Sequence, residues 1–406
     1  MTYQEALAWL YGTQRFGIKL GLENVRRLLG ELNVPAPDQR IIHVAGTNGK
    51  GSVCAMIDSI CRAAGYRTGL FISPHLVTYR ERIRVNGEMI APGDVAAGLT
   101  AIRELIEAWD PHPTFFEITT ALALDHFRKQ QCELIVLETG LGGRLDATNA
   151  LAPIVSVITP VGFDHEKWLG HTLEAIAGEK AGIIKAQVPV VSARQAAAAE
   201  KVIRARAAEC ESPLEFVSEP YGASAIALAG EHQRRNAALA IAALHAGDVE
   251  VSDDAIVRGL AKIEWPARFQ RWDERTVIDG AHNPAGAEVL AETWQREFGA
   301  ERATVILAVL REKNVADICR SLSPIAARFL LPQIRSERAL PPNELVAHVA
   351  AITPSLPHST APSFADSLES ARAHPERILI TGSLHFAGEA LATLQGDPDA
   401  LEDCAQ

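Results

Sequence analysis

The chain has 406 residues, of which 48% are hydrophobic and 22% are charged, and its formal net charge is −11. This length allows two domains with separate cores, and the composition is ordinary for a globular protein. The negative charge disfavours nucleic acid and anionic membranes as partners, so an anionic ligand would need a local cluster of backbone N–H groups, Lys and Arg.

The start of the sequence shows no basic-then-apolar signal segment, and no apolar run approaches the length of a membrane span.

Cysteines occur at positions 54, 61, 132, 210, 319 and 404, with no Cys-x-x-Cys pair. Zinc-site spacing is therefore absent. We expect buried thiols and a cytoplasmic location, because a reducing compartment keeps thiols free.

The first part of the chain alternates between short apolar runs, typical of buried strands, and apolar residues at helical spacing. In order, the sequence predicts helices over Tyr3–Tyr11 and Leu22–Leu32, a strand over Ile41–Ala45, a helix over Val53–Ala64 that ends at Gly65, and a strand over Thr68–Ile72. A hairpin over Ile83–Ile90 with an Asn86-Gly87 turn follows, then helices over Pro92–Trp109 and Glu117–Gln130 and strands over Leu134–Leu137 and Ile154–Ile158. This alternation predicts an α/β fold with a mainly parallel sheet between helices.

A second, smaller α/β unit of about 120 residues follows a proline-containing break at Trp265–Arg268. Its predicted strands are Thr276–Ile278, Thr304–Val309, Arg328–Leu331 and Ile378–Ile380. We predict domains over residues 1–270 and 271–395, and a disordered acidic tail over residues 396–406.

The segment Gly46–Ser52 lies between a predicted strand and a predicted helix, which is the arrangement that binds phosphate. Its three glycines let the backbone N–H groups turn inward, Lys50 could reach phosphates, and the hydroxyls of Thr47 and Ser52 could contact phosphate or Mg²⁺. The strict Walker pattern is not met, because Gly51 separates Lys50 from Ser52. A tight turn without a ligand is the alternative, but a turn alone needs neither three glycines nor a lysine.

Further motifs follow this loop across most of the chain. They are Ser73-Pro74-His75-Leu76, Glu81-Arg82-Ile83, Phe116-Glu117, residues 137–149 (LETGLGGRLDATN), residues 164–170 (DHEKWLG), residues 179–185 (EKAGIIK), residues 279–284 (DGAHNP) and residues 381–384 (TGSL). Together with the glycine-rich loop, and in this order, they resemble the folylpolyglutamate synthase and dihydrofolate synthase family of Mur-type peptide ligases.

The resemblance implies a P-loop, mainly parallel-sheet N-terminal ATPase domain followed by a smaller Rossmann-like α/β domain. It also implies an activity: ATP phosphorylates a pteroate or folate carboxylate, and the amino group of L-glutamate displaces phosphate from the acyl phosphate. The carboxylate substrate would be dihydropteroate, a reduced folate, or both. The family further implies a monomer.

The resemblance also assigns roles to individual residues. Nucleotide contacts fall on Gly46, Thr47, Asn48, Gly49, Lys50, Gly51, Ser52, Asn236, Arg268 and Asp279. Ser73 and Glu117 are implied to bind one Mg²⁺, and His165 a second together with a carbamylated Lys180. Catalytic roles fall on Lys50, Lys180 and His282.

Simpler explanations exist for some of these residues. Glu117 could be a helix N-terminal carboxylate, His165 a capped turn residue, and Lys180 a surface lysine paired with Glu179. The linker also departs from the usual Trp-Pro-Gly-Arg, because Ala267 replaces the glycine.

Two other functions fit parts of the pattern. A Mur-type peptidoglycan ligase is disfavoured because little chain precedes residue 40 for a separate UDP-binding domain. A P-loop switch or motor ATPase would hydrolyse ATP without requiring glutamate or pteroate.

Overall fold

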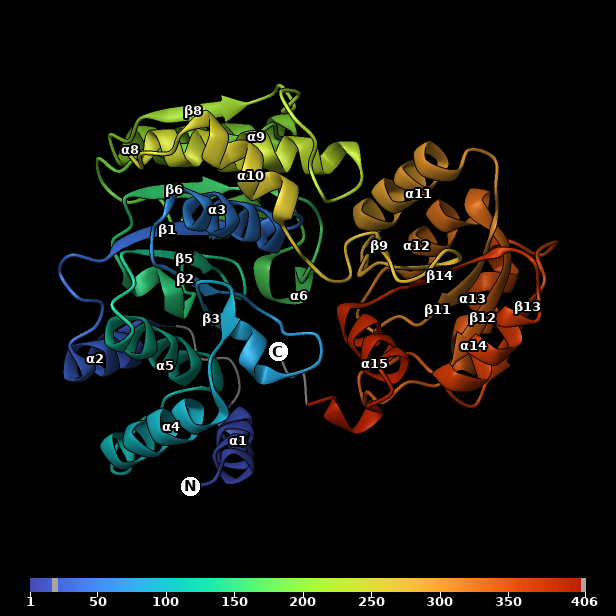
Figure 1. The fold of residues 1–406 in the computed structure, drawn as a ribbon, viewed down its shortest axis with the longest axis horizontal. Helices are drawn as coiled ribbons and strands as arrows, with labels where there is room; N and C mark the ends of the chain where they lie inside the picture. The colour runs from blue at the N-terminus through green and yellow to red at the C-terminus, as the bar shows by residue number, and fades with distance from the viewer. Residues whose placement is uncertain (17–20, 403–406) are drawn as a thin grey trace.

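The computed structural model describes residues 1–16 and 21–402, which form two α/β units side by side (Figure 1). The first is built on an eight-stranded sheet in the order β4-β3-β2-β5-β1-β6-β7-β8. Its strands are β1 (Arg40–Ala45), β2 (Thr68–Phe71), β3 (Ile83–Val85), β4 (Glu88–Met89), β5 (Leu134–Glu138), β6 (Val155–Ile158), β7 (Val190–Ala193) and β8 (Leu214–Val217). All neighbours pair in parallel except β3 with β2 and β4, which confirms the predicted mainly parallel sheet.

Helices cover both faces of this sheet because its central strands are buried on both sides. On β5, Ile135 and Leu137 point to one core, and Leu134 and Val136 point to another, as the two-residue period of a strand requires. The first core is closed by α1 (Tyr3–Gly12), α2 (Glu23–Leu32), α4 (Pro92–Ile106) and α5 (Phe115–Lys129). The second is closed by α3 (Lys50–Ala64), α9 (Glu231–Ala246) and α10 (Asp253–Lys262), while α6 (Glu166–Leu169), α7 (Leu173–Ala181) and α8 (Ala197–Glu209) follow β6 and β7.

The second unit has a six-stranded sheet in the order β13-β12-β11-β14-β10-β9, parallel except for β9. Its strands are β9 (Gln270–Arg271), β10 (Thr276–Ile278), β11 (Ala303–Leu307), β12 (Ala326–Pro332), β13 (His358–Ala361) and β14 (Arg377–Thr381). Its helices are α11 (Pro284–Phe298), α12 (Val315–Leu322), α13 (Pro342–Ile352), α14 (Phe364–Arg372) and α15 (Leu384–Leu394). Short 3₁₀ turns complete the chain: η1 (Thr13–Phe16), η2 (Tyr79–Arg82), η3 (Ala147–Ala150), η4 (Ser323–Ile325) and η5 (Pro398–Ala400).

The predicted strands and helices recur with small shifts at their ends, where assignments vary most. The hairpin is confirmed: Asn86 and Gly87 both have positive φ, 51° and 85°, as a type I′ turn requires. The sequence prediction missed four strands: the inner strand β7, which is only four residues long, the two-residue strand β9, and the edge strands β8 and β13. The residues of β8 and β13 are half-buried or exposed, so these two strands lack the continuous apolar run that marks an inner strand.

Five of the six cysteines are buried free thiols, as expected, and Cys404 lies outside the described residues. Within the described ranges, no helix is long and apolar enough to cross a membrane.

The predicted disordered tail differs from the structure over residues 396–402. This part follows α15, forms η5, and ends with Glu402 hydrogen-bonded to Tyr79 and Thr78 of the N-terminal unit. The rest of the predicted tail, residues 403–406, lies outside the described residues.

Gly259 on α10 provides a test of the helix packing that supports the glycine-rich loop. A Cβ at this position would lie 2.6 Å from the Cα of Ile60 on α3, so backbone would have to move. We expect Gly259→Ala to lower the free energy of unfolding in urea by about 1–3 kcal/mol. Gly30→Ala on α2 is the control, because open space surrounds that position; it should raise stability by about 0.5–1 kcal/mol. Equal stabilisation by both substitutions would contradict this packing.

Candidate functional site

A cavity of about 580 Å³ lies between the two units, and both contribute to its wall. The lining residues follow the carboxyl ends of the parallel strands, where open α/β sheets generally bind ligands. From the N-terminal unit they include Gly46–Ser52 after β1, Ser73 after β2, Glu138 at the end of β5 and His165 after β6. From the C-terminal unit they include Asp279 and His282 after β10, Lys313 after β11 and Ser383 after β14.

The glycine-rich loop presents the start of α3 to this cavity. Gly49 precedes the helix with φ at 90°, a conformation that glycine adopts without strain. The carbonyl of Pro160 accepts the N–H groups of Thr47 and Asn48 at 3.0 and 3.3 Å, which fixes the loop against the end of β6. The first turn of α3 leaves N–H groups without intrahelical acceptors, so an anion here would meet those donors and Lys50.

Trp265 of the linker explains the glycine that departs from the Walker pattern. A Cβ on Gly51 would lie 3.1 Å from Cζ2 of the Trp265 indole. The linker between the two units therefore packs directly on the phosphate loop. Arg84, from the hairpin, lies over the same indole at 5.6 Å from its centroid.

Lys180 is buried rather than on the surface, so its pairing with Glu179 is excluded. Its Nζ donates to the carbonyl of Gly46 at 2.7 Å, while Glu179 binds Arg144 at 2.9 Å. Burial, followed by repulsion from Lys50, lowers the pKa of Lys180 to about 7. A substantial share of this amine is therefore neutral near pH 7.

Glu138 provides a carboxylate beside the phosphate loop. It accepts a hydrogen bond from the backbone N–H of Ser73 at 3.1 Å and lies 3.9 Å from Nζ of Lys50. Burial raises the pKa of Glu138, and the positive charge of Lys50 opposes this shift. The hydroxyl of Ser73 is buried and has no hydrogen-bond partner among the described residues. An unpaired hydroxyl beside a carboxylate is an oxygen donor set that fits Mg²⁺.

Glu117 is not brought to the cavity, although the resemblance pairs it with Ser73. It is the third residue of α5, where its carboxylate accepts the N–H and hydroxyl of Thr114 at 2.8 and 2.9 Å. The helix-capping explanation accounts for this residue. Glu138 was missed as a site residue, yet its place at the end of an inner parallel strand was a readable signal.

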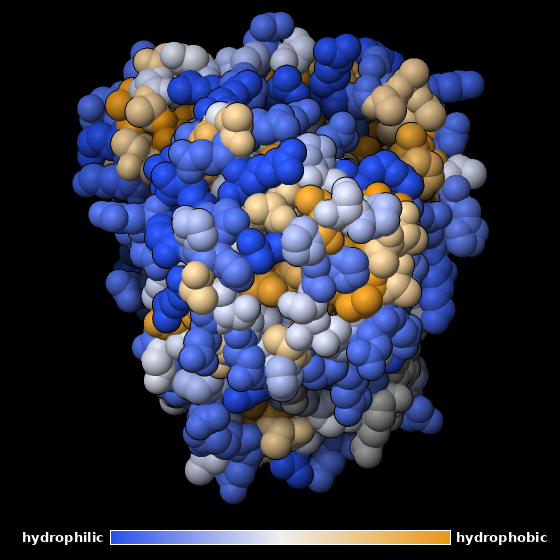
Figure 2. Space-filling view, turned by 90° about the vertical axis from the view of Figure 1, so that its right-hand side faces the viewer, coloured by the Kyte–Doolittle hydropathy of each residue, from blue (hydrophilic) through white to orange (hydrophobic). Residues whose placement is uncertain are grey.

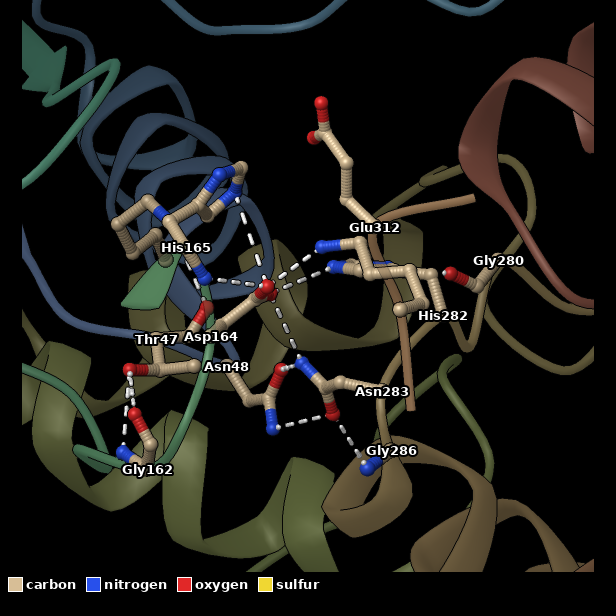
Figure 3. A network of polar contacts seen from close by, with 12 residues as sticks. Thr47, Asn48, Gly162, Asp164, His165, Gly280, His282, Asn283, Gly286 and Glu312 are labelled. Atoms are coloured by element: carbon tan, nitrogen blue, oxygen red, sulfur yellow. Dashed lines mark hydrogen bonds and ion pairs between the residues drawn. The ribbon is translucent and has the colours of Figure 1, made fainter. Parts of the chain in front are cut away.

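Asp164 joins the two units across the cavity (Figure 3). Its carboxylate forms an ion pair with Lys313 and lies 3.4 Å from Nε2 of His282, both from the C-terminal unit. Asn283 donates to it at 3.3 Å. Burial alone would raise the pKa of Asp164, but the hydrogen bond and charge of His282 and the charge of Lys313 hold it well below its usual range.

A second polar contact joins the two units at this junction. The side-chain amides of Asn48, in the phosphate loop, and Asn283 form two hydrogen bonds with each other, at 2.9 and 3.2 Å. His165 begins α6 with φ at 52°, and its Nε2 lies 3.9 Å from Asp164. Partial burial lowers the pKa of His165 to about 4, while 38% of its side chain stays exposed, so this imidazole is neutral at pH 7 and able to bind a metal ion.

Arg268 and Asp279 are both half-buried where the linker meets β10. Asp279 accepts the N–H groups of Phe269 and Ala281 at 2.8 Å each, so it shapes its turn as well as facing the cavity. Burial raises the pKa of Asp279 and lowers that of Arg268, while each charge opposes the shift of the other. Ala267 keeps a left-handed backbone with φ at 55°, so replacing the family's glycine does not abolish this turn.

Asn236 lies at the start of α9, opposite the phosphate loop. Its amide donates to Gln233 at 3.0 Å, and Gln233 donates to the hydroxyl of Ser52 at 3.4 Å.

The cavity lining contains every residue that the sequence assigns to the site except Glu117.

Comparison with known proteins identifies the family. Residues 44–209 match the Mur ligase middle domain, and residues 267–384 match the Mur ligase glutamate ligase domain. The chain is 36% identical to the Bacillus subtilis dihydrofolate synthase/folylpolyglutamate synthase over 95% of its own length and 98% of the relative. The chain belongs to the dihydrofolate synthase/folylpolyglutamate synthase family of Mur-type ligases.

Solved structures of this family have the same fold. Mycobacterium tuberculosis folylpolyglutamate synthase, solved with ADP and AMPPCP, superposes with a TM-score of 0.89 at 31% identity, covering 98% of this chain and 100% of that one. The Escherichia coli enzyme in complex with DHPP and ADP gives 0.86 at 30% identity, covering 96% and 98%. The protein is thus an ATP-dependent ligase, and the comparison disfavours a switch or motor ATPase.

The residues that could bind a metal ion are spread around the cavity. Across residues 1–16 and 21–402, no three His, Cys, Asp or Glu side chains gather closely enough to hold an ion by themselves. Mg²⁺ commonly binds through one or two carboxylates together with substrate phosphates and water. Ser73, Glu138 and His165 fit that mode.

Two glutamates offer a direct test of this assignment. We expect Glu138→Gln to raise the Mg²⁺ concentration for half-maximal turnover by at least about tenfold, because an amide is a poorer ligand than a carboxylate. Glu117→Gln is the matched control: it should lower the melting temperature through its weakened cap and leave the Mg²⁺ dependence unchanged. The reverse pattern would restore Glu117 as the ligand. Mg²⁺ titration of turnover and thermal unfolding provide the two measurements.

Proposed function

We propose that this ligase joins L-glutamate to the carboxylate of dihydropteroate and also to the glutamate of a reduced folate. It would then be both a dihydrofolate synthase and a folylpolyglutamate synthase. The Bacillus subtilis and Escherichia coli relatives carry both names. The observation that carries the proposal is the cavity between the units, whose lining brings Lys50 of the N-terminal unit and Arg268 of the linker together with residues 279–282 of the C-terminal unit.

The proposed reaction has two steps. A substrate carboxylate oxygen attacks the γ-phosphorus of ATP, the bond to the β-phosphate oxygen breaks, and ADP leaves. The amino group of glutamate then attacks the acyl carbon, phosphate leaves, and the nitrogen loses a proton to give the amide. Lys50, Arg268 and the N–H groups of α3 offset the charge of the anions that must meet here.

Closure of the two units supports this chemistry. An acyl phosphate hydrolyses if water reaches it, so the intermediate must form in an enclosed site. Asp164, held by His282 and Lys313, keeps the C-terminal unit over the phosphate loop. We propose that His282 lies near the phosphates and the incoming glutamate, with Ser383 at the glutamate pocket.

Two Mg²⁺ ions would supply positive charge to the transferring phosphoryl group. We propose Ser73 and Glu138 as protein ligands at one site and His165 at the other. Glu138 replaces the glutamate expected from the sequence because it faces the cavity and Glu117 does not. The nucleotide would lie between Gly46–Ser52, Asn236 and Asp279, and the pterin near Ser73–Arg82 and the hairpin.

We also propose that Lys180 carries a carbamate. Its neutral amine would attack the carbon of CO₂ and release one proton, giving an anion in place of a buried cation. The lowered pKa of Lys180 and the proximity of the Lys50 charge support this exchange. The new carboxylate would face the cavity and help His165 to hold the second ion.

The division into domains at residues 270 and 271, a monomeric state and a cytoplasmic location complete the proposal. Figure 2 shows the outer face of the C-terminal unit, where hydrophilic side chains dominate and apolar ones form small scattered groups. Such a surface offers no broad apolar interface on that face. The five buried free thiols suit a reducing compartment.

A product assay tests the substrates. The enzyme with ATP, Mg²⁺ and glutamate should form an amide from dihydropteroate and extend the tail of tetrahydrofolate. Lys50→Ala should lower turnover by at least about 1000-fold, since it removes the charge next to the transferred phosphoryl group. Lys262→Ala, on the exposed end of α10, is the control and should keep wild-type turnover. Absence of product from both substrates would refute the substrate assignment, and full activity of Lys50→Ala would refute the role of the loop.

Labelled bicarbonate tests the carbamate. Wild-type protein in ¹³C-bicarbonate should show a carbamate carbon resonance by NMR that Lys180→Ala lacks. The signal should grow as pH rises through about 7, because only the neutral amine of Lys180 attacks CO₂. Lys180→Ala should be inactive and regain part of its activity with added acetate or formate. A wild-type spectrum without this resonance would contradict the proposal.

A further inference from the structure

The segment after α15 crosses from the C-terminal unit to the N-terminal unit. Arg335 donates to the carbonyl of Pro398 at 2.9 Å, which keeps η5 on the C-terminal unit. The backbone N–H of Glu402 then donates to the carbonyl of Val77 at 2.8 Å.

The side chain of Glu402 binds two separate elements of the N-terminal unit. Its carboxylate accepts the hydroxyl of Tyr3, at the start of α1, at 2.9 Å. It also accepts the hydroxyl of Thr78 at 3.1 Å and the backbone N–H of Tyr79 at 2.6 Å. Burial raises the pKa of Tyr3, so its hydroxyl remains a proton donor throughout the neutral range. Several donors on one carboxylate make a strong and directional attachment.

Glu402 thus holds the loop that forms one wall of the ligand cavity. Ser73, Leu76 and Glu81 of this loop line the cavity, and Ser73 lies next to Glu138. Internally, the Glu81 carboxylate accepts the N–H groups of Leu76, Val77 and Thr78 at 2.9 Å each. The loop therefore has its own internal support before the C-terminal unit touches it.

The C-terminal unit adds two external supports to the same loop. The first is α15, where a Cβ on Gly388 would lie 1.9 Å from the carbonyl oxygen of Leu76. The second is Glu402, bound to Thr78 and Tyr79. Both contacts come from the C-terminal unit, so both require that this unit is docked.

We propose that Glu402 is a positioning residue that couples docking of the C-terminal unit to the shape of the pterin-side wall, residues 73–82. This inference rests on the proposed function for the identity of the ligand at that wall. Glu402 does not line the cavity, so it acts through Thr78 and Tyr79. Its effect should fall on the folate substrate, whereas the nucleotide, bound by the phosphate loop, should be affected little.

The test compares three variants with the wild type. Glu402→Ala should raise KM for the folate substrate by about tenfold, the cost of losing hydrogen bonds to a charged acceptor. KM for ATP and kcat should stay close to wild type. Glu402→Gln keeps an acceptor oxygen without the charge and should show a smaller rise. Asp397→Asn is the control: it alters charge on the same segment at an exposed position and should change neither constant.

Hydrogen exchange supplies a readout that does not depend on the substrate. Backbone amides of residues 73–82 should exchange faster in Glu402→Ala than in wild type or Asp397→Asn, while those of α3 should not change. Tyr3→Phe removes one donor and provides a milder variant if Glu402→Ala folds poorly. Unchanged exchange and unchanged KM in folded Glu402→Ala would overturn the proposal, as would an equal rise in KM for ATP. If wild-type enzyme forms no product, the substrate assignment fails, and the exchange experiment still decides the role of Glu402.

Discussion

The ligand cavity depends on one buried carboxylate, Asp164, which belongs to the N-terminal unit and binds donors from the C-terminal unit. Removing a carboxylate from water is costly unless cations and hydrogen-bond donors surround it. Here Lys313, His282 and Asn283 supply both. Because these donors follow β10 and β11, the interaction can form only when the carboxyl ends of the two sheets face each other. The contacts of Asp164 therefore require the same arrangement of the two units that encloses the cavity.

The charges inside this cavity are incompletely compensated by the protein alone. Burial lowers the pKa of Lys180 and of Arg268, and it raises the pKa of Glu138 and of Asp279. Each shift shows that burial destabilises the charged form of the side chain, which a ligand of opposite charge would stabilise. A triphosphate, divalent cations and a carboxylate substrate would provide such partners together. Because the cavity contains both cationic and anionic side chains, it complements the anions and the divalent cations together better than any one of these ligands alone. This suits a reaction in which two anions must meet.

The sequence predicted what is decided locally. Strand, glycine-rich loop and helix at residues 41–64 form by short-range rules, and the structure reproduces them. Glu117 lies in the first turn of a helix and Glu138 at the end of an inner strand, and either position can place a carboxylate in a ligand site. Only the tertiary structure shows that Glu138, and not Glu117, lines the cavity. One local signal was available: Thr114 and Glu117 have the spacing of a capping box, which explains Glu117 without a ligand. The pairing of Lys313 with Asp164, and of Glu402 with Tyr3, joins residues far apart in sequence, and no local pattern could have shown them.

The irregular phosphate loop follows from the same two-unit architecture. In a loop that meets only its nucleotide, the position after the lysine has no reason to be glycine. Here a Cβ on Gly51 would meet the Trp265 indole at 3.1 Å, which is tighter than an ordinary van der Waals contact. Trp265 opens the linker that continues through Ala267 and Phe269, both with positive φ, on either side of the half-buried Arg268. The loop that receives phosphate and the linker that carries the second unit are thus in direct contact. Movement of one unit relative to the other would therefore change the packing of Trp265 on the phosphate loop.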